Sequence, residues 1–332
     1  MRVKSLLTAV LVLGLAVGAF SQRVLNVYTA FDVDQAQVYF AAFERAHPDI
    51  KVEWVRLSAG ALLARLRAEF PRPGASLWLA GPSDTHIVAA AEGMLEAYTE
   101  SLAWQYLPPW AKCPDGYWAG IYTGFIGFAT NTEFLARHGL EPPTSWHDLL
   151  KPEYANNVSM AYPYTSGTGY TRLAAFVFLM GEEAGLEFER KLSEHAVHHY
   201  TASGSAPATE AGLGEVAVGI AFSHDILARG IGRGYPVVMS FPKEGTGYEV
   251  GAISLIKNGP EPELAKVFYD WMMSAEAQSL YQAWYRVPLN PESEIHPAAV
   301  TAADVALVDY DFIWAAENRD RLCDLWQELT GF

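Results

Sequence analysis

Cysteine is scarce in this chain, and several familiar chemical motifs are missing. The two cysteines, Cys113 and Cys323, are far apart, so there is no C-x-x-C motif of a thiol redox protein or zinc site. The chain also lacks an H-E-x-x-H motif, a Walker loop and a dinucleotide-binding fingerprint after a strand. We therefore expect no cofactor and no resident metal. In an exported protein the two cysteines could form one disulfide, and two free buried thiols fit equally well.

Basic residues are also few. There are 23 Lys and Arg against 38 Asp and Glu, which gives a formal net charge of −15. This acidic balance argues against nucleic acid or an anionic membrane surface as a partner. It leaves a small anionic solute open as the ligand, because the electric field inside a pocket depends on the residues that line it.

A long apolar run stands only at the N-terminus. Met1 to Lys4 is a short basic start, residues 6–20 are apolar, and Ala19-Phe20-Ser21 places small residues before a cut at Gln22. This pattern is typical of a secretory signal, and the run is too short to span a membrane. No cysteine stands at the cut, so a lipid anchor is not indicated. We expect residues 1–21 to be removed and the mature chain to be soluble in the periplasm.

The mature chain of about 310 residues has the pattern of an α/β protein. Its 51% hydrophobic and 13% aromatic content indicates a well-packed protein, long enough for two cores. Strands are expected at 24–28, 50–55 and 76–80, and helices at 34–47, 61–70 and 85–92. Val38, Phe40 and Phe43 are expected on the buried face of the first helix. This order predicts mainly parallel sheets, which bind ligands at the carboxyl ends of their strands.

The same pattern starts again in the middle of the chain. Strands are expected at 117–129, 158–161, 215–222 and 248–257, and helices at 132–138, 173–195, 263–273 and 275–285. We therefore predict two α/β lobes, hinged by two crossover strands near 117–131 and 248–257. Lobe 1 would comprise residues 22–120 with 250–295, and lobe 2 residues 121–249. Residues 296–332 would form a helical tail that packs on the lobes.

A loop rich in hydroxyl groups and glycine, residues 163–171, precedes the helix expected from residue 173. The first N–H groups of a helix are unpaired and carry partial positive charge. Ser166 and Thr168 add hydroxyl donors, while Gly167 and Gly169 let the backbone come close to a bound group. This pattern predicts an anion site. Simple capping of the helix by Ser166 would use the same residue types.

Several short motifs are together similar to one protein family. They are Val27-Tyr28-Thr29-Ala30, FERAHPDIKV at 43–52, TSWHDL at 144–149, SGTGY at 166–170, GEVAVG at 214–219, FPKEGTGYE at 241–249, and DW at 270–271 with SAEAQ at 274–278. Essentially all of the mature chain resembles the periplasmic solute-binding proteins of ABC importers (family 1 extracellular solute-binding proteins), in the branch that binds ferric ion, phosphonates and hexose phosphates. The resemblance implies a monomeric two-lobe clamp of the type II fold. Such a clamp closes on a small solute and delivers it to a permease in the inner membrane.

The resemblance leaves iron open as an alternative ligand. Ferric-binding members place adjacent tyrosines at the strand end that corresponds to Ser223-His224-Asp225, and this chain has no Tyr-Tyr pair. His198, His199 and Tyr200 could suggest a metal cluster, and we expect them at a helix end. Adjacent residues on a helix point in different directions, so such a pair chelates poorly. We therefore keep iron(III) binding as the alternative to a phosphorylated or otherwise anionic organic solute.

Hexose-phosphate binders of this branch carry a His-Asp step at that strand end and an acidic residue on the following strand. The resemblance therefore implies that His224, Asp225 and Glu249 hold the sugar end, with the two carboxylates accepting charge-assisted hydrogen bonds. Tyr28 and Ser203 are expected beside them. The anionic group would be bound by a second set of residues, namely Ser58, Ser166, Gly167, Thr168 and Gly169. Either acid could instead be a surface or capping residue.

An enzyme is the rival class of function. A glycosidase needs two opposed carboxylates, and a serine hydrolase needs a nucleophile elbow, whereas Ser166 stands in S-G-T-G rather than G-x-S-x-G. His224 and Asp225 are adjacent in sequence and form no relay by spacing alone. We therefore expect a binding protein and not an enzyme, with an exported phosphate-ester hydrolase as a remote alternative.

The predicted signal can be tested directly. Export should leave a mature chain that starts near Gln22, because the basic start, the apolar run and the small residues at 19 and 21 fit a signal peptidase site. N-terminal sequencing of the exported protein measures this. Recovery of a secreted chain that still begins with Met1 would contradict the prediction.

Overall fold

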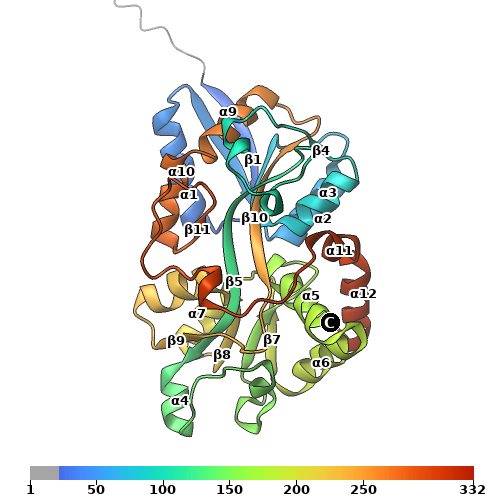
Figure 1. Cartoon of the computed structure of the whole chain (residues 1–332), viewed down its shortest axis with the longest axis vertical. Coiled ribbons are helices and arrows are strands. Elements are labelled where there is room, and N and C mark those ends of the chain that lie inside the picture. The colour runs from blue at the N-terminus through green and yellow to red at the C-terminus, as the bar shows by residue number, and fades with distance from the viewer. Residues whose placement is uncertain (1–21) are drawn as a thin grey trace, which may run out of the picture.

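The computed structural model describes residues 22–332, so the predicted signal at 1–21 lies outside the described residues. Two α/β lobes lie one above the other along the long axis of the molecule (Figure 1). Two long strands, β5 (Ala119–Asn131) and β10 (Tyr248–Ile256), run through both lobes and pair with each other. The predicted two-lobe α/β fold with two crossover strands is confirmed. Among the described residues, no helix is long and apolar enough to cross a membrane.

Lobe 1 contains three parallel strands in the order β2-β1-β3, followed by β10. Thr29 at the end of β1 lies opposite Arg56 on β2 and Leu79 on β3, so the carboxyl ends of these strands meet at one edge. The strands are β1 (Arg23–Thr29), β2 (Ile50–Arg56) and β3 (Leu77–Pro82), with the short β4 (Leu95–Glu96) and β11 (Val287–Pro288). The helices are α1 (Val33–Ala46), α2 (Ala59–Glu69), α3 (Ser83–Ala91), α9 (Pro262–Met272) and α10 (Ala275–Ser279).

Lobe 2 repeats the arrangement, with parallel strands in the order β8-β6-β7. Its strands are β6 (Val158–Ala161), β7 (Val197–Thr201), β8 (Val218–Phe222) and β9 (Val237–Ser240). Its helices are α4 (Thr132–His138), α5 (Gly167–Met180), α6 (Glu182–His195), α7 (Ala206–Leu213) and the single turn α8 (Ser223–Asp225). The crossover strands pair antiparallel with their neighbours, so both sheets are mixed rather than parallel throughout.

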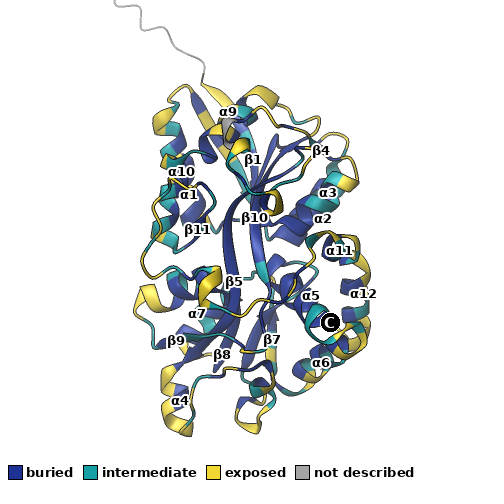
Figure 2. Cartoon of the chain, in the orientation of Figure 1, coloured by how far each residue is buried: buried dark blue, intermediate teal, exposed yellow. Residues whose placement is uncertain are grey.

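Each lobe is built around its own apolar core (Figure 2). In lobe 1, aromatic side chains of α1 and α9, such as Phe43 and Phe268, pack against the sheet. In lobe 2, Trp146 packs edge-on against Phe128 and Phe176. Each lobe therefore buries apolar surface of its own, as separate domains do.

The C-terminal segment contacts both lobes through α11 (Phe312–Glu317) and α12 (Arg319–Thr330) (Figure 1). Helix α11 lies on α3 of lobe 1, and α12 lies on α6 of lobe 2. At their junction the buried Arg319 donates to Asp84 Oδ2 at 2.6 Å and to the Pro163 carbonyl at 3.2 Å. The segment therefore joins the lobes on the side where α3, α5 and α6 lie.

Several expectations about helices need correction. The single helix expected at 173–195 is two helices, because Gly181 adopts a φ of +83° and ends α5. Val38 is 41% exposed, since the buried face of α1 carries Ala36, Tyr39, Phe40 and Phe43 instead. The helix expected at 275–285 is the short α10 followed by a 3₁₀ turn at Leu280–Trp284.

Two further points concern histidines and cysteines. His198 and His199 lie on strand β7 rather than at a helix end, and His199 Nε2 lies 3.0 Å from Glu210 Oε2. The His198 ring lies edge-on to the His199 ring at 5.1 Å, and His198 Nδ1 lies 3.3 Å from Asn156 Oδ1. Cys113 and Cys323 are both free thiols, half-buried and buried respectively. Of the two alternatives for the cysteines, the structure shows the unpaired one.

The burial of α12 predicts that the C-terminal segment contributes to the stability of lobe 2. Trp326 is fully buried in the lobe 2 core, and its indole donates to Glu189 Oε2 at 3.2 Å. Trp326→Ala should therefore lower the free energy of unfolding by about 3–5 kcal/mol. Urea unfolding measures this, with Leu329→Ala on the exposed face of the same helix as a near-neutral control. Equal effects of the two substitutions would contradict the assignment.

Candidate functional site: the cleft between the lobes

A pocket lies between the lobes and is lined by residues of both. Its walls come mainly from the carboxyl ends of strands and the helix starts that follow them: Arg56 after β2, Pro82 after β3, and His224 after β8. The sequence therefore folds so that the edges at which α/β sheets bind ligands face each other across the cleft.

Two helix N-termini meet at one end of the pocket. Ser58 precedes α2 and makes no capping bond with its side chain, whereas Ser166 Oγ accepts from Gly169 N at 3.4 Å. The N–H groups of Gly60 and Ala61 donate to the Thr165 carbonyl at 3.0 and 3.3 Å, which joins the two helix starts across the cleft. Both starts bring partial positive charge to this end.

Small residues let this end close tightly. A Cβ added at Gly167 would lie 2.4 Å from Pro82 Cδ of the other lobe. A Cβ at Gly204 would lie 2.0 Å from Thr168 Oγ1. Each glycine therefore permits an approach that a side chain would block, and the backbone of α5 comes within reach of a group bound in the pocket.

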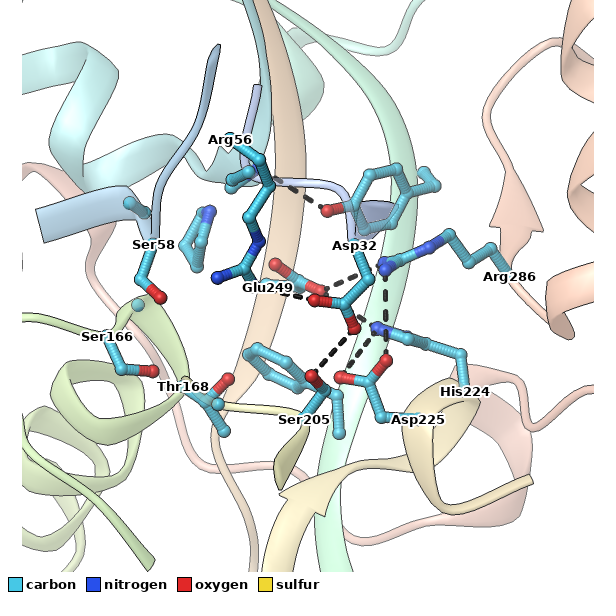
Figure 3. Close-up of a pocket in the computed structure, with 18 residues that line it drawn as sticks. Asp32, Arg56, Ser58, Ser166, Thr168, Ser205, His224, Asp225, Glu249 and Arg286 are labelled. Atoms are coloured by element: carbon cyan, nitrogen blue, oxygen red, sulfur yellow. Dashed lines mark hydrogen bonds and ion pairs between the residues drawn. The ribbon is translucent and has the colours of Figure 1, made fainter. Parts of the chain in front are cut away.

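Arg56 adds a full positive charge beside these hydroxyl groups. Figure 3 shows its guanidinium between Ser58 and Asp32, with Ser166 and Thr168 below. Its Nη2 donates to Asp32 Oδ1 at 2.6 Å and to Ser203 Oγ at 3.2 Å. Its Nε is buried and has no hydrogen-bond partner among residues 22–332. This end of the pocket is therefore rich in donors.

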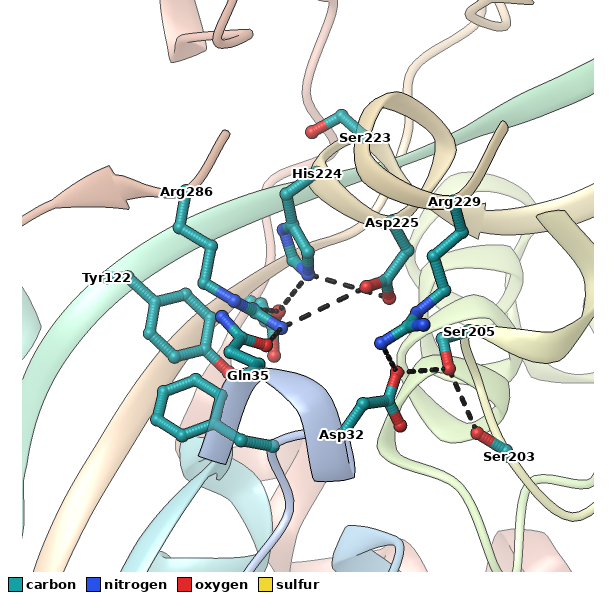
Figure 4. A network of polar contacts seen from close by, with 12 residues as sticks. Asp32, Gln35, Tyr122, Ser203, Ser205, Ser223, His224, Asp225, Arg229 and Arg286 are labelled. Carbon is teal, nitrogen blue, oxygen red and sulfur yellow. Dashed lines mark hydrogen bonds and ion pairs between the residues drawn. The ribbon is translucent and has the colours of Figure 1, made fainter. Parts of the chain in front are cut away.

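Three buried ionisable groups, His224, Glu249 and Arg286, form the other end together with the half-buried Asp225 (Figures 3 and 4). His224 Nε2 lies 3.6 Å from Asp225 Oδ2 and 3.5 Å from Glu249 Oε1. Arg286 Nη1 lies 3.6 Å from Glu249 Oε1, and Arg286 Nη2 lies 3.9 Å from Asp225 Oδ1. These separations are too long for good hydrogen bonds but short enough for strong electrostatic coupling in a buried site.

Burial decides the protonation of this group. It raises the pKa of Asp225 to about 6 and that of Glu249 to about 8, and in both cases the Arg286 charge opposes the rise. Burial also holds the pKa of His224 well below its usual range, and Arg286 and Arg229 add to this effect. At neutral pH, Asp225 is mostly ionised, while His224 is neutral and Glu249 carries a proton. With this raised pKa, Glu249 can donate a hydrogen bond as well as accept one at neutral pH.

Ion pairs cross the cleft beside the pocket (Figure 4). Asp32, at the start of α1 in lobe 1, accepts from Ser205 Oγ at 2.7 Å and lies 2.7 Å from Arg229 Nη2, both in lobe 2. Arg229 also donates to Asp34 Oδ1 at 2.9 Å. The structure is therefore a closed form, in which residues of the two lobes bond to each other at the rim.

Seven of the ten predicted site residues line the pocket: Ser58, Ser166, Gly167, Thr168, His224, Asp225 and Glu249. Ser203 lies just behind the lining and bonds to Arg56 and Ser205. Gly169 lies deeper in the first turn of α5. Tyr28 is elsewhere: its hydroxyl bonds to Glu69 and its ring lies under Arg65, because neighbouring residues of a strand point to opposite faces.

Four charged or polar lining residues were not predicted: Asp32, Arg56, Ser205 and Arg286. Arg56 is the last residue of β2, so the strand-end rule that selected Ser58 could also have selected it. Asp32 likewise follows β1 closely. Arg286 follows a 3₁₀ turn late in the chain, and no motif marks it. No cluster of three or more His, Cys, Asp or Glu residues within 22–332 has the geometry of a metal site.

The raised pKa of Glu249 predicts a pH-dependent cost to folding. Between the unfolded value of 4.5 and about 8, the native state keeps a proton that the unfolded chain has lost, so stability falls as the pH rises. Glu249→Gln cannot ionise, and should match the wild type near pH 4 but exceed its stability by on the order of 1–4 kcal/mol at pH 8. Urea unfolding across this range tests it. Parallel curves for the two proteins would contradict the prediction.

Comparisons with known proteins agree with this geometry. An uncharacterized protein of Haemophilus influenzae is 35% identical over 336 residues, which cover 97% of this chain and 95% of that protein. The periplasmic binding protein AfuA of Actinobacillus pleuropneumoniae, solved with fructose-6-phosphate bound, is 32% identical with a TM-score of 0.89 over 94% of this chain and 100% of its own. The periplasmic binding protein P5PA is 29% identical with a TM-score of 0.87, over 92% and 99% of the two chains.

More distant structures share the fold alone. Iron-bound HitA of Pseudomonas aeruginosa has a TM-score of 0.79 at 19% identity, over 92% of this chain and 99% of its own. The family model for bacterial extracellular solute-binding proteins matches residues 85–315. Because the family and its structural neighbours are binding proteins, the chain is a binding protein and not an enzyme. It belongs to the bacterial extracellular solute-binding proteins and is the periplasmic solute-binding component of an ABC transporter.

Proposed function

We propose that this protein captures a phosphorylated sugar, such as a hexose or pentose phosphate, and delivers it to its permease. The observation that carries the proposal is the division of the pocket into two chemically different ends. One end gathers two helix N-termini, three hydroxyl groups and Arg56. The other gathers an ionised Asp225, a protonated Glu249, a neutral His224 and Arg286.

The first end matches a phosphate group. A phosphate presents oxygen acceptors and close to two negative charges, so it needs several donors and a cation. Ser58, Ser166 and Thr168 can donate hydroxyl hydrogens, and the first turn of α5 can donate backbone N–H groups. Arg56 supplies the cation. Its guanidinium also bonds to Asp32 at 2.6 Å, so a carboxylate holds this cation in place beside the hydroxyl groups.

The second end matches sugar hydroxyls. A hydroxyl both donates and accepts hydrogen bonds. Asp225 accepts, Glu249 and Arg286 donate, and the neutral His224 ring can do either according to its tautomer. The fructose-6-phosphate bound by AfuA supports this ligand class, since that protein is 32% identical over nearly the full length of both chains.

Iron(III) binding has less support. Ferric sites need hard anionic oxygen ligands, and within the described residues the one phenol that lines the pocket is Tyr122. Burial holds the pKa of this phenol far above its ordinary value. The Arg286 guanidinium also lies 4.2 Å from the centre of its ring, where it would repel a trivalent cation.

The assignment of ends can be tested with two substitutions. Thr168→Ala should weaken all phosphorylated ligands by about tenfold to a hundredfold, since it removes a hydrogen bond to the charged group that they share. Asp225→Ala should weaken fructose 6-phosphate by a similar factor and leave inorganic phosphate nearly unaffected. Isothermal titration calorimetry measures both, with Thr330→Ala on α12 as a control far from the cleft.

Two results would count against the proposal. If Asp225→Ala weakened inorganic phosphate as much as the sugar phosphate, the two ends would be wrongly assigned. If ferric citrate gave a tyrosinate charge-transfer band at one iron per chain, the iron alternative would replace the proposal. Turnover of phosphate esters by the purified protein would instead revive the hydrolase.

A further inference from the structure

Arg286 is held rigidly in the wall of the pocket although no sequence motif marks it. Its guanidinium lies 4.2 Å from the ring centre of Tyr122 and 5.1 Å from that of Phe31. Its Nη2 donates to Gln35 Oε1 at 3.2 Å. The side chain is 7% exposed. The two aromatic rings and the buried Gln35 amide therefore fix the plane and direction of the Arg286 guanidinium (Figure 4).

Two N–H donors of this guanidinium form no hydrogen bond with the described part of the protein. Within residues 22–332, Arg286 Nε and Nη1 have no hydrogen-bond partner, and both are buried. Buried donors without a partner cost free energy, so native proteins rarely keep them without a function. Nη1 lies 3.6 Å from Glu249 Oε1, and Nη2, which also bonds to Gln35, lies 3.9 Å from Asp225 Oδ1. Both carboxyl groups therefore lie close to the guanidinium without a good hydrogen bond to it.

We propose that Arg286 is a ligand-binding residue that shares a sugar hydroxyl with Asp225, and that this pair selects a neutral polyol at the end opposite the phosphate. The proposal rests on the proposed function. Arg286 can only donate and an ionised Asp225 can only accept, while a hydroxyl does both. A carboxylate there would satisfy Arg286 but be repelled by Asp225. An ammonium group would satisfy Asp225 but be repelled by Arg286.

The surrounding charges support a neutral partner. Five charged or titratable groups surround Asp225. They are its neighbour His224, Asp32 at the start of α1, Arg56 on β2, Arg229 in the turn after α8, and Arg286 in the segment before β11. Glu249 faces Arg286, Asp225, His224, Tyr122 and Asp84. With Glu249 protonated and His224 neutral, the charges of Arg286 and Asp225 cancel. An added charge would then be buried without a counterion.

The first test uses the unaltered protein. Calorimetry at pH 7.5 should give tighter binding for fructose 6-phosphate than for 6-phosphogluconate or glucosamine 6-phosphate, by tenfold or more. The acid and the amine keep the phosphate but place a charge on the remainder of the molecule. Equal or tighter binding of either charged ligand would overturn the selection of a neutral end. If no phosphorylated polyol bound at all, the proposed function itself would fail, which is a different outcome.

The second test separates hydrogen bonding from charge. Arg286→Met should weaken fructose 6-phosphate by about tenfold to a hundredfold and leave inorganic phosphate within about threefold at fixed pH. As the pH is lowered, affinity should fall when Asp225 takes up a proton. Arg286 lowers the pKa of Asp225, so Arg286→Met should move this fall in affinity to higher pH. Arg286→Lys keeps the positive charge and should leave the pH of this fall in affinity unchanged. It should still weaken binding, since an ammonium group cannot replace the paired N–H donors of the guanidinium.

Controls keep the outcome clear. Arg321→Met removes an exposed arginine that pairs with Glu182, far from the cleft, and should change neither affinity nor pH profile. Thermal unfolding of each variant checks that it is folded. Wild-type affinity for fructose 6-phosphate in both Arg286 variants would overturn the role of Arg286 while leaving the sugar-phosphate function standing. A general loss of affinity, inorganic phosphate included, would show a structural role and would also overturn it.

Discussion

The antiparallel pairing of β5 with β10 is the constraint on which the site depends. It sets Glu249 opposite Gly124 and Gly251 opposite Tyr122, and so brings two site residues onto neighbouring strands between the lobes. A Cβ at Gly124 would lie 2.5 Å from the His224 ring, and one at Gly251 would lie 2.1 Å from the Tyr122 ring. The two glycines therefore leave the space that these side chains occupy. The strands that hinge the lobes also form the floor of the pocket, so closure and ligand contact share one structural element.

Burial turns this floor into a selective surface. In water an arginine and two carboxylates would attract each other weakly and leave a bound sugar little to gain. Here Arg286 and Glu249 are almost fully buried, and Arg286 lies 3.6 Å from Glu249 and 3.9 Å from Asp225, which leaves hydrogen-bonding capacity unused. The same burial keeps Glu249 protonated at neutral pH. The floor therefore carries both hydrogen-bond donors and acceptors.

Local rules in the sequence predicted most of this architecture, and tertiary packing decided the rest. Strand and helix order identified the two-lobe fold, and the loop before α5 and the strand end at His224 identified both ends of the pocket. The prediction that Tyr28 lies in the pocket was wrong. Neighbouring residues of a strand point to opposite faces, so a one-residue shift decides which side chain faces the cleft. Arg286 could not be found, since it reaches the cleft from a segment about 60 residues after Asp225 in sequence and is placed there by stacking on Phe31 and Tyr122. The break at Gly181 was readable, because glycine ends helices, but an apolar pattern continued across it.

The rim contacts show how ligand and closure cooperate. Asp32 bonds to Arg56 in its own lobe and to Ser205 and Arg229 across the cleft. The side chains of Asp32, Arg56 and Arg229 are 13–23% exposed. Partly solvated ion pairs contribute about 0–1 kcal/mol each, so the rim alone holds the closed form weakly. A phosphate between Ser58 of lobe 1 and Thr168 of lobe 2 would add charge-assisted bonds to both lobes at once. Because those bonds form only when the lobes meet, the free energy of binding the anion is also free energy of closure.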